Sequence, residues 1–299
     1  MRWRGGRRSQ NVDDRRSQRS SRAMGGGAAS LLPLVMKLAA TKGGLFIIAI
    51  GALVMWLSGG NLGGLLGLGG MAPSAEQQPL RESAAERQTV EFVSVVLADT
   101  EDTWHALFKQ AGRSYQEPRL VLFRGAIRSA CGMGEAAMGP FYCPGDQQIY
   151  IDLSFFDELH QRFKAPGDFA QAYVLAHEVG HHVQTLLGIS AKTHAARSRL
   201  SSIEANKLSV RQELQADCFA GVWAHHAQKA RNILESGDLE EALAAATAIG
   251  DDRLQKSARG YVTPDSFTHG TSAQRVKWFR MGILHGSLRQ CDTFSSAEL

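Results

Sequence analysis

The chain has 299 residues, enough for one substantial domain with appendages, and a net charge of +4. Residues 1–42 contain ten Lys and Arg and two acidic residues, whereas the rest of the chain carries a net charge of −4. A mildly acidic domain without a basic stripe argues against nucleic-acid binding.

The N-terminal region predicts a tail followed by a membrane anchor. Residues 1–37 are rich in Arg, Ser and Gly, which predicts a disordered basic tail. No charge occurs from Gly43 to Ala75, and because about 20 apolar residues cross a bilayer, 38–60 is predicted to form one transmembrane helix. A cleaved signal peptide is the alternative, but the polar region is unusually long for one and no small-residue cleavage site directly follows the apolar core.

The charge of the tail predicts the orientation of the chain. By the positive-inside rule, the ten basic residues place the N-terminus in the cytoplasm. The single span then places the domain on the extracytoplasmic side of the membrane.

A Gly-rich and then polar stretch, 61–88, is predicted to be a linker, and 89–299 is predicted to be the domain. Apolar patterns within the domain predict its main elements. Helices are expected over 90–97, 103–108, 172–187, 210–223, 238–250 and 272–284, and strands over 120–123 and 148–153.

The pattern over 172–187 combines His-Glu-x-x-His with apolar residues at helical spacing. On a helix, His177 and His181 lie one above the other, so both can bind one metal ion. Glu178 lies beside them, where it can take a proton from a water activated by the metal. Such a motif can occur by chance, but this helix is too apolar for the surface, and buried histidines need partners. The sequence therefore predicts a zinc site.

The next helical pattern supplies a third ligand. Glu213 and Asp217 are four residues apart and share one face of the helix. Glu213 is predicted to bind the metal, and Asp217 to accept the outer N–H of a ligand histidine. A solvated acidic face is the alternative, but the apolar run after Asp217 predicts burial.

The four cysteines predict two disulfides in an exported domain. Cys131 and Cys143 bracket a Gly-rich segment and form the natural local pair, which leaves Cys218 to pair with Cys291. Free buried thiols are the alternative. A Cys-rich zinc site is less favoured because Cys-x-x-Cys does not occur.

His177-Glu178-x-x-His181 followed by Glu213-x-x-Ala216-Asp217 resembles the gluzincin arrangement of thermolysin-like and membrane-associated zinc peptidases. Over nearly the whole chain, the pattern is similar to that of the bacterial neutral zinc metallopeptidases, the YpfJ-like family. The marks of this resemblance are the Arg-rich opening, Gly-Pro-Phe-Tyr-Cys-Pro-Gly-Asp from Gly139, and Pro-Asp-Ser-Phe-Thr-His from Pro264. The resemblance implies a zincin-like α+β domain, mostly helical with a small sheet, that binds Zn²⁺.

The resemblance implies roles for two more regions. Zinc peptidases of this kind carry an edge strand upstream of the metal helix, here 148–153, which would bind an extended peptide as an added strand. An ordinary core strand is the alternative. His269 resembles a loop histidine of related membrane peptidases and is the candidate donor to the oxyanion, with Tyr261 in reserve. A His269 that caps local backbone is the alternative.

These features together predict a membrane-anchored, zinc-dependent endopeptidase that acts on a peptide or protein substrate. Zn²⁺ held by the two histidines and Glu213 would activate a water, and Glu178 would take its proton. Two alternatives remain. One is a non-proteolytic zinc-binding scaffold of the cell envelope, which would not need Glu178. The other is a hydrolase of a non-peptide amide.

Overall fold

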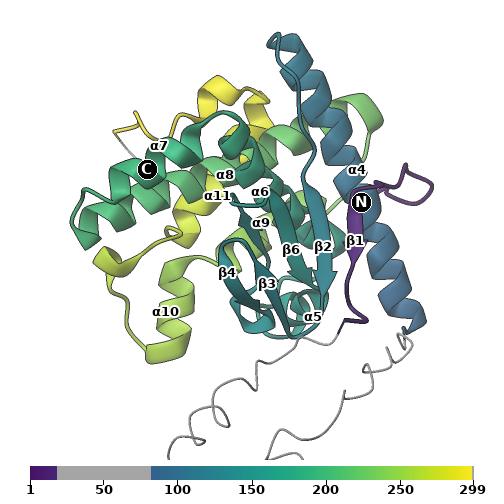
Figure 1. Cartoon of the computed structure of the whole chain (residues 1–299), viewed down its shortest axis with the longest axis horizontal. Helices are drawn as coiled ribbons and strands as arrows, with labels where there is room; N and C mark the ends of the chain where they lie inside the picture. The colour runs from purple at the N-terminus through teal and green to yellow at the C-terminus, as the bar shows by residue number, and fades with distance from the viewer. Residues whose placement is uncertain (19–81, 298–299) are drawn as a thin grey trace, which may run out of the picture. The chain divides into compact units, whose positions relative to one another are not determined.

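The computed structural model describes residues 1–18 and 82–297 (Figure 1). Helices dominate these residues and a small sheet accompanies them, so the predicted α+β class is confirmed. The predicted transmembrane helix over 38–60 and most of the predicted linker lie outside the described residues. Among the helices that are described, none is both long enough and apolar enough to span a membrane.

The main sheet contains four strands in the order β1, β2, β6 and β5. They are β1 (Val12–Asp14), β2 (Arg119–Phe123), β6 (Gln148–Asp152) and β5 (Phe141–Cys143). β1 and β2 are parallel, as are β2 and β6, whereas β5 is antiparallel to β6. A separate antiparallel hairpin joins β3 (Ala126–Ser129) to β4 (Gly132–Glu135).

The interpretation of 148–153 as an edge strand is wrong. β6 is paired on both sides, with β2 and with β5, and its Ile149 and Ile151 are fully buried. Its apolar run therefore marks a core strand, which was the alternative. The outer strand at this end of the sheet is β5.

Residues 1–18 belong to the folded domain, so the prediction of a disordered tail is wrong for them. β1 extends the sheet in parallel register, with Val12 opposite Leu120 (Figure 1). Residues 1–18 and 82–297 belong to one compact unit. The rest of the predicted tail, 19–37, lies outside the described residues.

Two basic side chains of this N-terminal segment form ion pairs with the domain. Arg7 pairs with Glu101 and Asp102 on α4 (Ala84–Gln110). Arg16, which is almost fully buried, contacts the carboxylates of Asp14, Glu82 and Glu86. The positive charge that predicted a disordered tail thus complements the acidic balance of the rest of the chain.

The other helices follow in chain order. They are η1 (Ala136–Met138), α5 (Ser154–Gln161), α6 (Asp168–Leu186), α7 (Ile189–Arg197), α8 (Ser202–Arg231), α9 (Asp238–Ala248), α10 (Asp251–Arg259), η2 (Pro264–Ser266), α11 (Ser272–His285) and η3 (Leu288–Cys291). The two helices predicted over 90–97 and 103–108 are one helix, α4, which also takes the last residues of the predicted linker. The helix predicted over 210–223 is the middle of α8.

The core lies where α6, α8 and α11 pack together. Phe169 of α6 stacks on Trp223 of α8, and Tyr173 contacts Phe279 of α11 edge to face. α8 and α11 approach so closely that a Cβ on Gly282 would lie 2.0 Å from the carbonyl oxygen of Cys218. Only glycine fits at this crossing, and the crossing holds α11 against the middle of α8.

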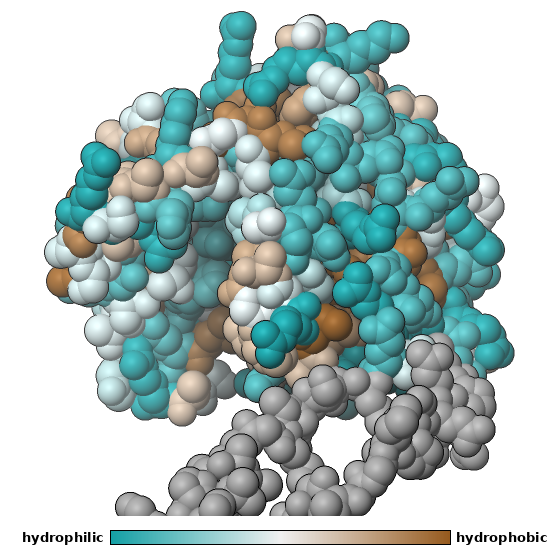
Figure 2. Space-filling model, in the orientation of Figure 1, coloured by the Kyte–Doolittle hydropathy of each residue, from teal (hydrophilic) through white to brown (hydrophobic). Residues whose placement is uncertain are grey.

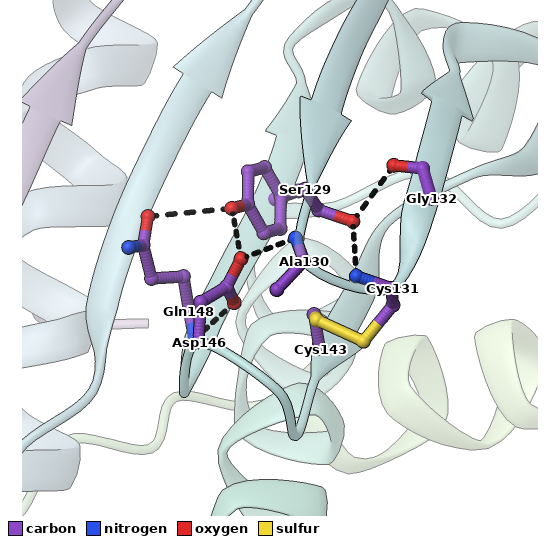
Figure 3. The surroundings of a disulfide bond; sticks show 8 residues. Ser129, Ala130, Cys131, Gly132, Cys143, Asp146 and Gln148 are labelled. Carbon is purple, nitrogen blue, oxygen red and sulfur yellow. Dashed lines mark hydrogen bonds between the residues drawn. A yellow bond between two sulfur atoms is a disulfide. The ribbon is translucent and has the colours of Figure 1, made fainter.

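Both predicted disulfides are confirmed. Cys131 in the β3–β4 turn bonds to Cys143 at the end of β5, and Cys218 on α8 bonds to Cys291 in η3. Figure 3 shows that the first bond is reinforced by Asp146, which accepts a hydrogen bond from the backbone N–H of Ala130. The hairpin is therefore fastened to the turn that joins β5 to β6.

Candidate metal centre

The metal helix α6 is almost entirely buried. It begins after Gly167, whose φ of +115° favours glycine, and the chain leaves it at Gly188, with a φ of +76°. Gly180 lies where α6 meets α8, and a Cβ there would lie 2.9 Å from the carbonyl oxygen of Ala216. The small residue within the His-Glu-x-x-His motif therefore lets the second helix come close to the two histidines.

The three predicted ligands lie together where α6 and α8 come close. The Oε2 atom of Glu213 lies 3.2 Å from Nε2 of His177 and 3.4 Å from Nε2 of His181. Zinc bonds of about 2.0–2.2 Å in a tetrahedral arrangement separate neighbouring ligand atoms by about 3.3 Å. The spacing and the chemistry of these donors therefore fit one zinc ion.

Asp217 orients the first histidine. Its Oδ1 atom accepts hydrogen bonds from Nδ1–H of His177 at 2.8 Å and from the Tyr173 hydroxyl at 2.5 Å. Arg275 of α11 donates to both carboxylate oxygens at 2.9 Å. Asp217 is fully buried, so the Arg275 charge allows it to stay ionised. With Nδ1 of His177 engaged in this way, Nε2 faces the metal position.

The second histidine is oriented by an amide. Nδ1–H of His181 donates to Oε1 of Gln184 at 2.9 Å, which leaves Nε2 for the metal. The neighbouring His182 has a different role. It donates from Nε2 to the carbonyl oxygen of Gln116 and accepts at Nδ1 from the Tyr142 hydroxyl, so it fastens β5 to the metal helix.

The electrostatics of the cluster follow from burial opposed by close charges. Burial lowers the pKa of His177, but attraction to Asp217 outweighs it and raises the pKa to about 9. Burial likewise opposes protonation of His181, yet Glu213 raises its pKa. Burial would raise the pKa of Glu213, whereas His181 and His177 hold it well below its usual range. Zinc binding must therefore displace protons from this cluster.

Glu178 differs from its neighbours in having no protein partner. The residue is buried to 7% exposure and lines the same cleft as the ligands. Within residues 1–18 and 82–297, its carboxylate forms no hydrogen bond or ion pair. It remains available to a water or a substrate in the cleft, as a general base requires.

The three predicted ligands line a cleft of about 520 Å³. Figure 2 shows it as a furrow between the side of the molecule that carries α10 and the side that carries the β3–β4 hairpin. One wall is formed by 137–142, from η1 to β5, and apolar side chains line part of the rest: Phe155, Phe163, Val174, Leu254 and Ala258. A larger hollow of about 790 Å³, beside Arg16 and Glu86, contains none of the proposed metal ligands.

The two candidate donors have different surroundings. His269 lines the cleft, and its Nδ1 lies 3.2 Å from Oδ1 of Asp251, the first residue of α10. The hydrogen bond with Asp251 raises the pKa of His269 against the effect of burial. Tyr261 is 62% exposed, packs against Arg259 and is not among the residues that line the cleft. The structure brings His269 to the ligands but not Tyr261.

Sequence reasoning missed several residues of this centre. Arg275 belongs to it although nothing in its local pattern marks it, because its partner is chosen by packing between helices. Gln184 was detectable, since it follows His181 by three residues on α6. Tyr173 was detectable, since it precedes His177 by four residues and so shares its face of α6.

A second acidic cluster, with Asp168 and Asp238, binds the α-ammonium of Met1.

Comparison with known proteins places the whole chain in context. A family model described as "Putative neutral zinc metallopeptidase" matches residues 1–294. The chain is 50% identical over 297 residues to the protein YpfJ of Escherichia coli (strain K12), covering 99% of this chain and 100% of that one. Proteins of Mycobacterium bovis and Mycobacterium tuberculosis are 42% identical over 218 residues, covering 70% of this chain and 73% of theirs. No solved structure matches the chain.

Proposed function

Because the chain belongs to the neutral zinc metallopeptidase family, we propose that it is a zinc-dependent endopeptidase. One observation supports this most directly. Two histidines and a glutamate converge at zinc spacing beside Glu178, a carboxylate without a protein partner, in an open cleft. A closed structural zinc site would have no use for such a carboxylate.

His177, His181 and Glu213 would hold the zinc, which supplies the Lewis acidity that activates a water for attack on a carbonyl. Glu178 accepts the proton of the attacking water and delivers it to the leaving amine. His269, whose pKa is raised by the hydrogen bond with Asp251, donates to the oxyanion that forms as the carbonyl is attacked. Arg275 and Asp217 hold His177 in the required orientation throughout.

The shape of the cleft favours a peptide as substrate. β5 is an outer strand, and its Phe141 and Tyr142 line the cleft, so an extended peptide can add to it by backbone hydrogen bonds. The apolar lining from α5, α6 and α10 suits a large apolar side chain next to the cleaved bond. A scaffold or a hydrolase of small amides has no need of this combination.

The decisive experiment is cleavage of casein and of a peptide library by the purified protein, with and without chelator and zinc. Glu178→Gln is expected to abolish cleavage while zinc stoichiometry stays at the wild-type value, because Glu178 is not a ligand. Glu158→Gln, a second carboxylate at the cleft, is the matched control and should keep its activity. Zinc-loaded wild type that cleaves no peptide, or an active Glu178→Gln, would contradict the proposal.

We also propose that the domain acts outside the cytoplasm, next to the inner membrane. Two disulfides support an oxidising compartment. The uncharged stretch from Gly43 to Ala75 supports contact with a membrane. The pairing of β1 with β2 adds a constraint, since a segment paired into the sheet must be in the same compartment as the domain. We therefore place residues 1–18 outside with the domain, in place of a cytoplasmic tail.

A further inference from the structure

His177 and His181 are oriented by different chemistry. His177 donates to the ionised, fully buried Asp217, whereas His181 donates to Gln184, a neutral amide that is also fully buried. A carboxylate can only accept a hydrogen bond, so it leaves a histidine one choice of tautomer. An amide presents either an acceptor or a donor, so Gln184 can orient His181 only if its own orientation is set by something else.

That orientation is set by groups behind it. Nε2 of Gln184 donates to the carbonyl oxygen of Gln212 at 2.7 Å and to Oε1 of Gln215 at 3.1 Å. Nε2 of Gln215 in turn donates to the carbonyl oxygen of Cys291 at 2.9 Å. Both side chains are buried, so water does not compete for these bonds.

The direction of this chain of hydrogen bonds is unambiguous. The carbonyl oxygen of Cys291 can only accept, so Gln215 must turn its NH₂ group towards it and its oxygen towards Gln184. The carbonyl oxygen of Gln212 can likewise only accept, so Gln184 offers its NH₂ group to both Gln212 and Gln215 and its oxygen to His181. His181 therefore has to donate from Nδ1 and keep the lone pair of Nε2 for the metal.

We call the hydrogen bonds from the carbonyl oxygen of Cys291 through Gln215 and Gln184 to His181 the relay. The carbonyl of Cys291 is itself held in place. Cys291 is bonded to Cys218, which lies three residues after Gln215 on the same side of α8. The chain beyond it is fastened to the same helix, because the Thr293 hydroxyl donates to the carbonyl oxygen of Arg211 at 2.6 Å. The disulfide thus places an acceptor at one fixed position beside α8.

We propose that Gln184 and Gln215 are positioning residues for His181, and that the Cys218–Cys291 disulfide holds the acceptor on which they depend. The inference rests on the proposed function only in taking His181 as a zinc ligand. Oxidation of this disulfide then strengthens zinc binding, in addition to the orientation that Gln184 receives from the carbonyl oxygen of Gln212. The Cys131–Cys143 disulfide fastens the β3–β4 hairpin to β5 and holds no carbonyl of this relay.

Three variants and one matched control test this in the full-length protein. Gln215→Met keeps the volume of the side chain but breaks the relay. Gln184→Met removes the partner of His181, and the paired change of Cys218 and Cys291 to Ala releases the acceptor. The paired change of Cys131 and Cys143 to Ala is the control. Zinc dissociation is measured by transfer to a chromogenic chelator, and exchange of the Gln184 side-chain NH₂ group by NMR on metal-free protein.

We expect zinc affinity to fall by about 10–100-fold in Gln184→Met, the usual effect of losing the partner of a ligand histidine. Gln215→Met and the Cys218/Cys291 variant should lose zinc faster than wild type and exchange the Gln184 amide faster. The Cys131/Cys143 variant should match wild type in both measurements. Equal zinc loss and equal amide exchange in the two cysteine variants would overturn the relay.

The two proposals can fail separately. Wild-type protein that binds zinc but cleaves nothing removes the proposed function and leaves the relay intact. Circular dichroism identifies a cysteine variant that does not fold, in which case Gln215→Met, with both disulfides present, decides. An unchanged zinc dissociation rate in a folded Gln215→Met protein contradicts the relay whatever the activity.

Discussion

At the scale of single residues, the metal centre depends on the buried charge of Arg275, which lies outside the His-Glu-x-x-His motif. Arg275 and Asp217 are both buried, and Asp217 is also the partner of His177. Removing one member of a buried ion pair leaves the other uncompensated, which costs about 3–5 kcal/mol. The metal site and the stability of the core are therefore coupled through one carboxylate.

This coupling makes a prediction for Arg275→Met. We expect the free energy of unfolding to fall by about 3–5 kcal/mol and zinc affinity to fall with it, because an uncompensated Asp217 no longer holds His177. Arg280→Met, an exposed arginine on the same helix, is the control and should change neither quantity. Urea denaturation and zinc titration measure the two effects. A stable Arg275→Met with wild-type zinc affinity would show that Asp217 does not depend on this partner.

A second prediction concerns the pH dependence of catalysis. The hydrogen bond with Asp251 raises the pKa of His269, so a protonated donor persists to higher pH than in a free histidine. Asp251→Asn removes that effect and lowers the pKa, so the alkaline fall of kcat should move to lower pH. His269→Ala should instead lower kcat by about 10²–10³-fold with little change in KM. An alkaline limb that does not move in Asp251→Asn would exclude His269 as the donor.

At the scale of elements, the site depends on how closely α6 and α8 approach each other. Gly180→Ala places a Cβ 2.9 Å from the carbonyl oxygen of Ala216, which is backbone and cannot turn away. We expect a net loss of stability, since overpacking costs about 1–3 kcal/mol while alanine favours the helix over glycine by about 1 kcal/mol.

Zinc affinity should fall in the same variant, because separation of the helices moves Glu213 away from the histidines. Thermal unfolding and zinc titration are the measurements. Adding Ala216→Gly should not rescue either property, because the closest contact is with the backbone of that residue. Rescue by the second change would mean that the helices are separated by side chains.

At the scale of the whole molecule, the N-terminal segment constrains which compartment the chain ends can occupy. β1 is paired with β2, and Arg7 and Arg16 are neutralised by carboxylates of the domain. A span crossed only once between this segment and the domain would pull β1 out of the sheet. A chain folded in this way therefore has residues 1–18 and the domain in the same compartment.

Cysteine accessibility tests this arrangement in intact cells. Ser17→Cys and Ser114→Cys are both at exposed positions of the folded unit, before and after the undescribed segment. We expect a membrane-impermeant maleimide to label both from outside. A cysteine introduced into a cytoplasmic marker protein is the negative control. Labelling of position 114 without position 17 would restore the single-span prediction and mean that β1 is not paired in the cell.

Much of the centre was predictable because its spacing is local. His177 and His181, and then Glu213 and Asp217, are each four residues apart, and helical geometry alone puts each pair on one face. The apolar period places both helices in the core, and the even cysteine count indicated two bonds, which the structure confirms. The metal and catalytic roles of these residues remain predictions that the variants above would test.

Only the tertiary structure decided the rest, because the deciding contacts join parts of the chain that no local pattern relates. The composition of the basic opening predicts disorder, whereas in the structure Arg7 pairs with the carboxylates of Glu101 and Asp102 on α4. β6 was interpreted as an edge strand, whereas in the structure it pairs with β2 on one side and β5 on the other. Nothing in the sequence distinguishes Arg275 from other helix residues, and only the crossing of α11 and α8 brings it to Asp217. Periodicity determines which face of an element is buried, but the partner of that face is chosen by packing across the whole domain.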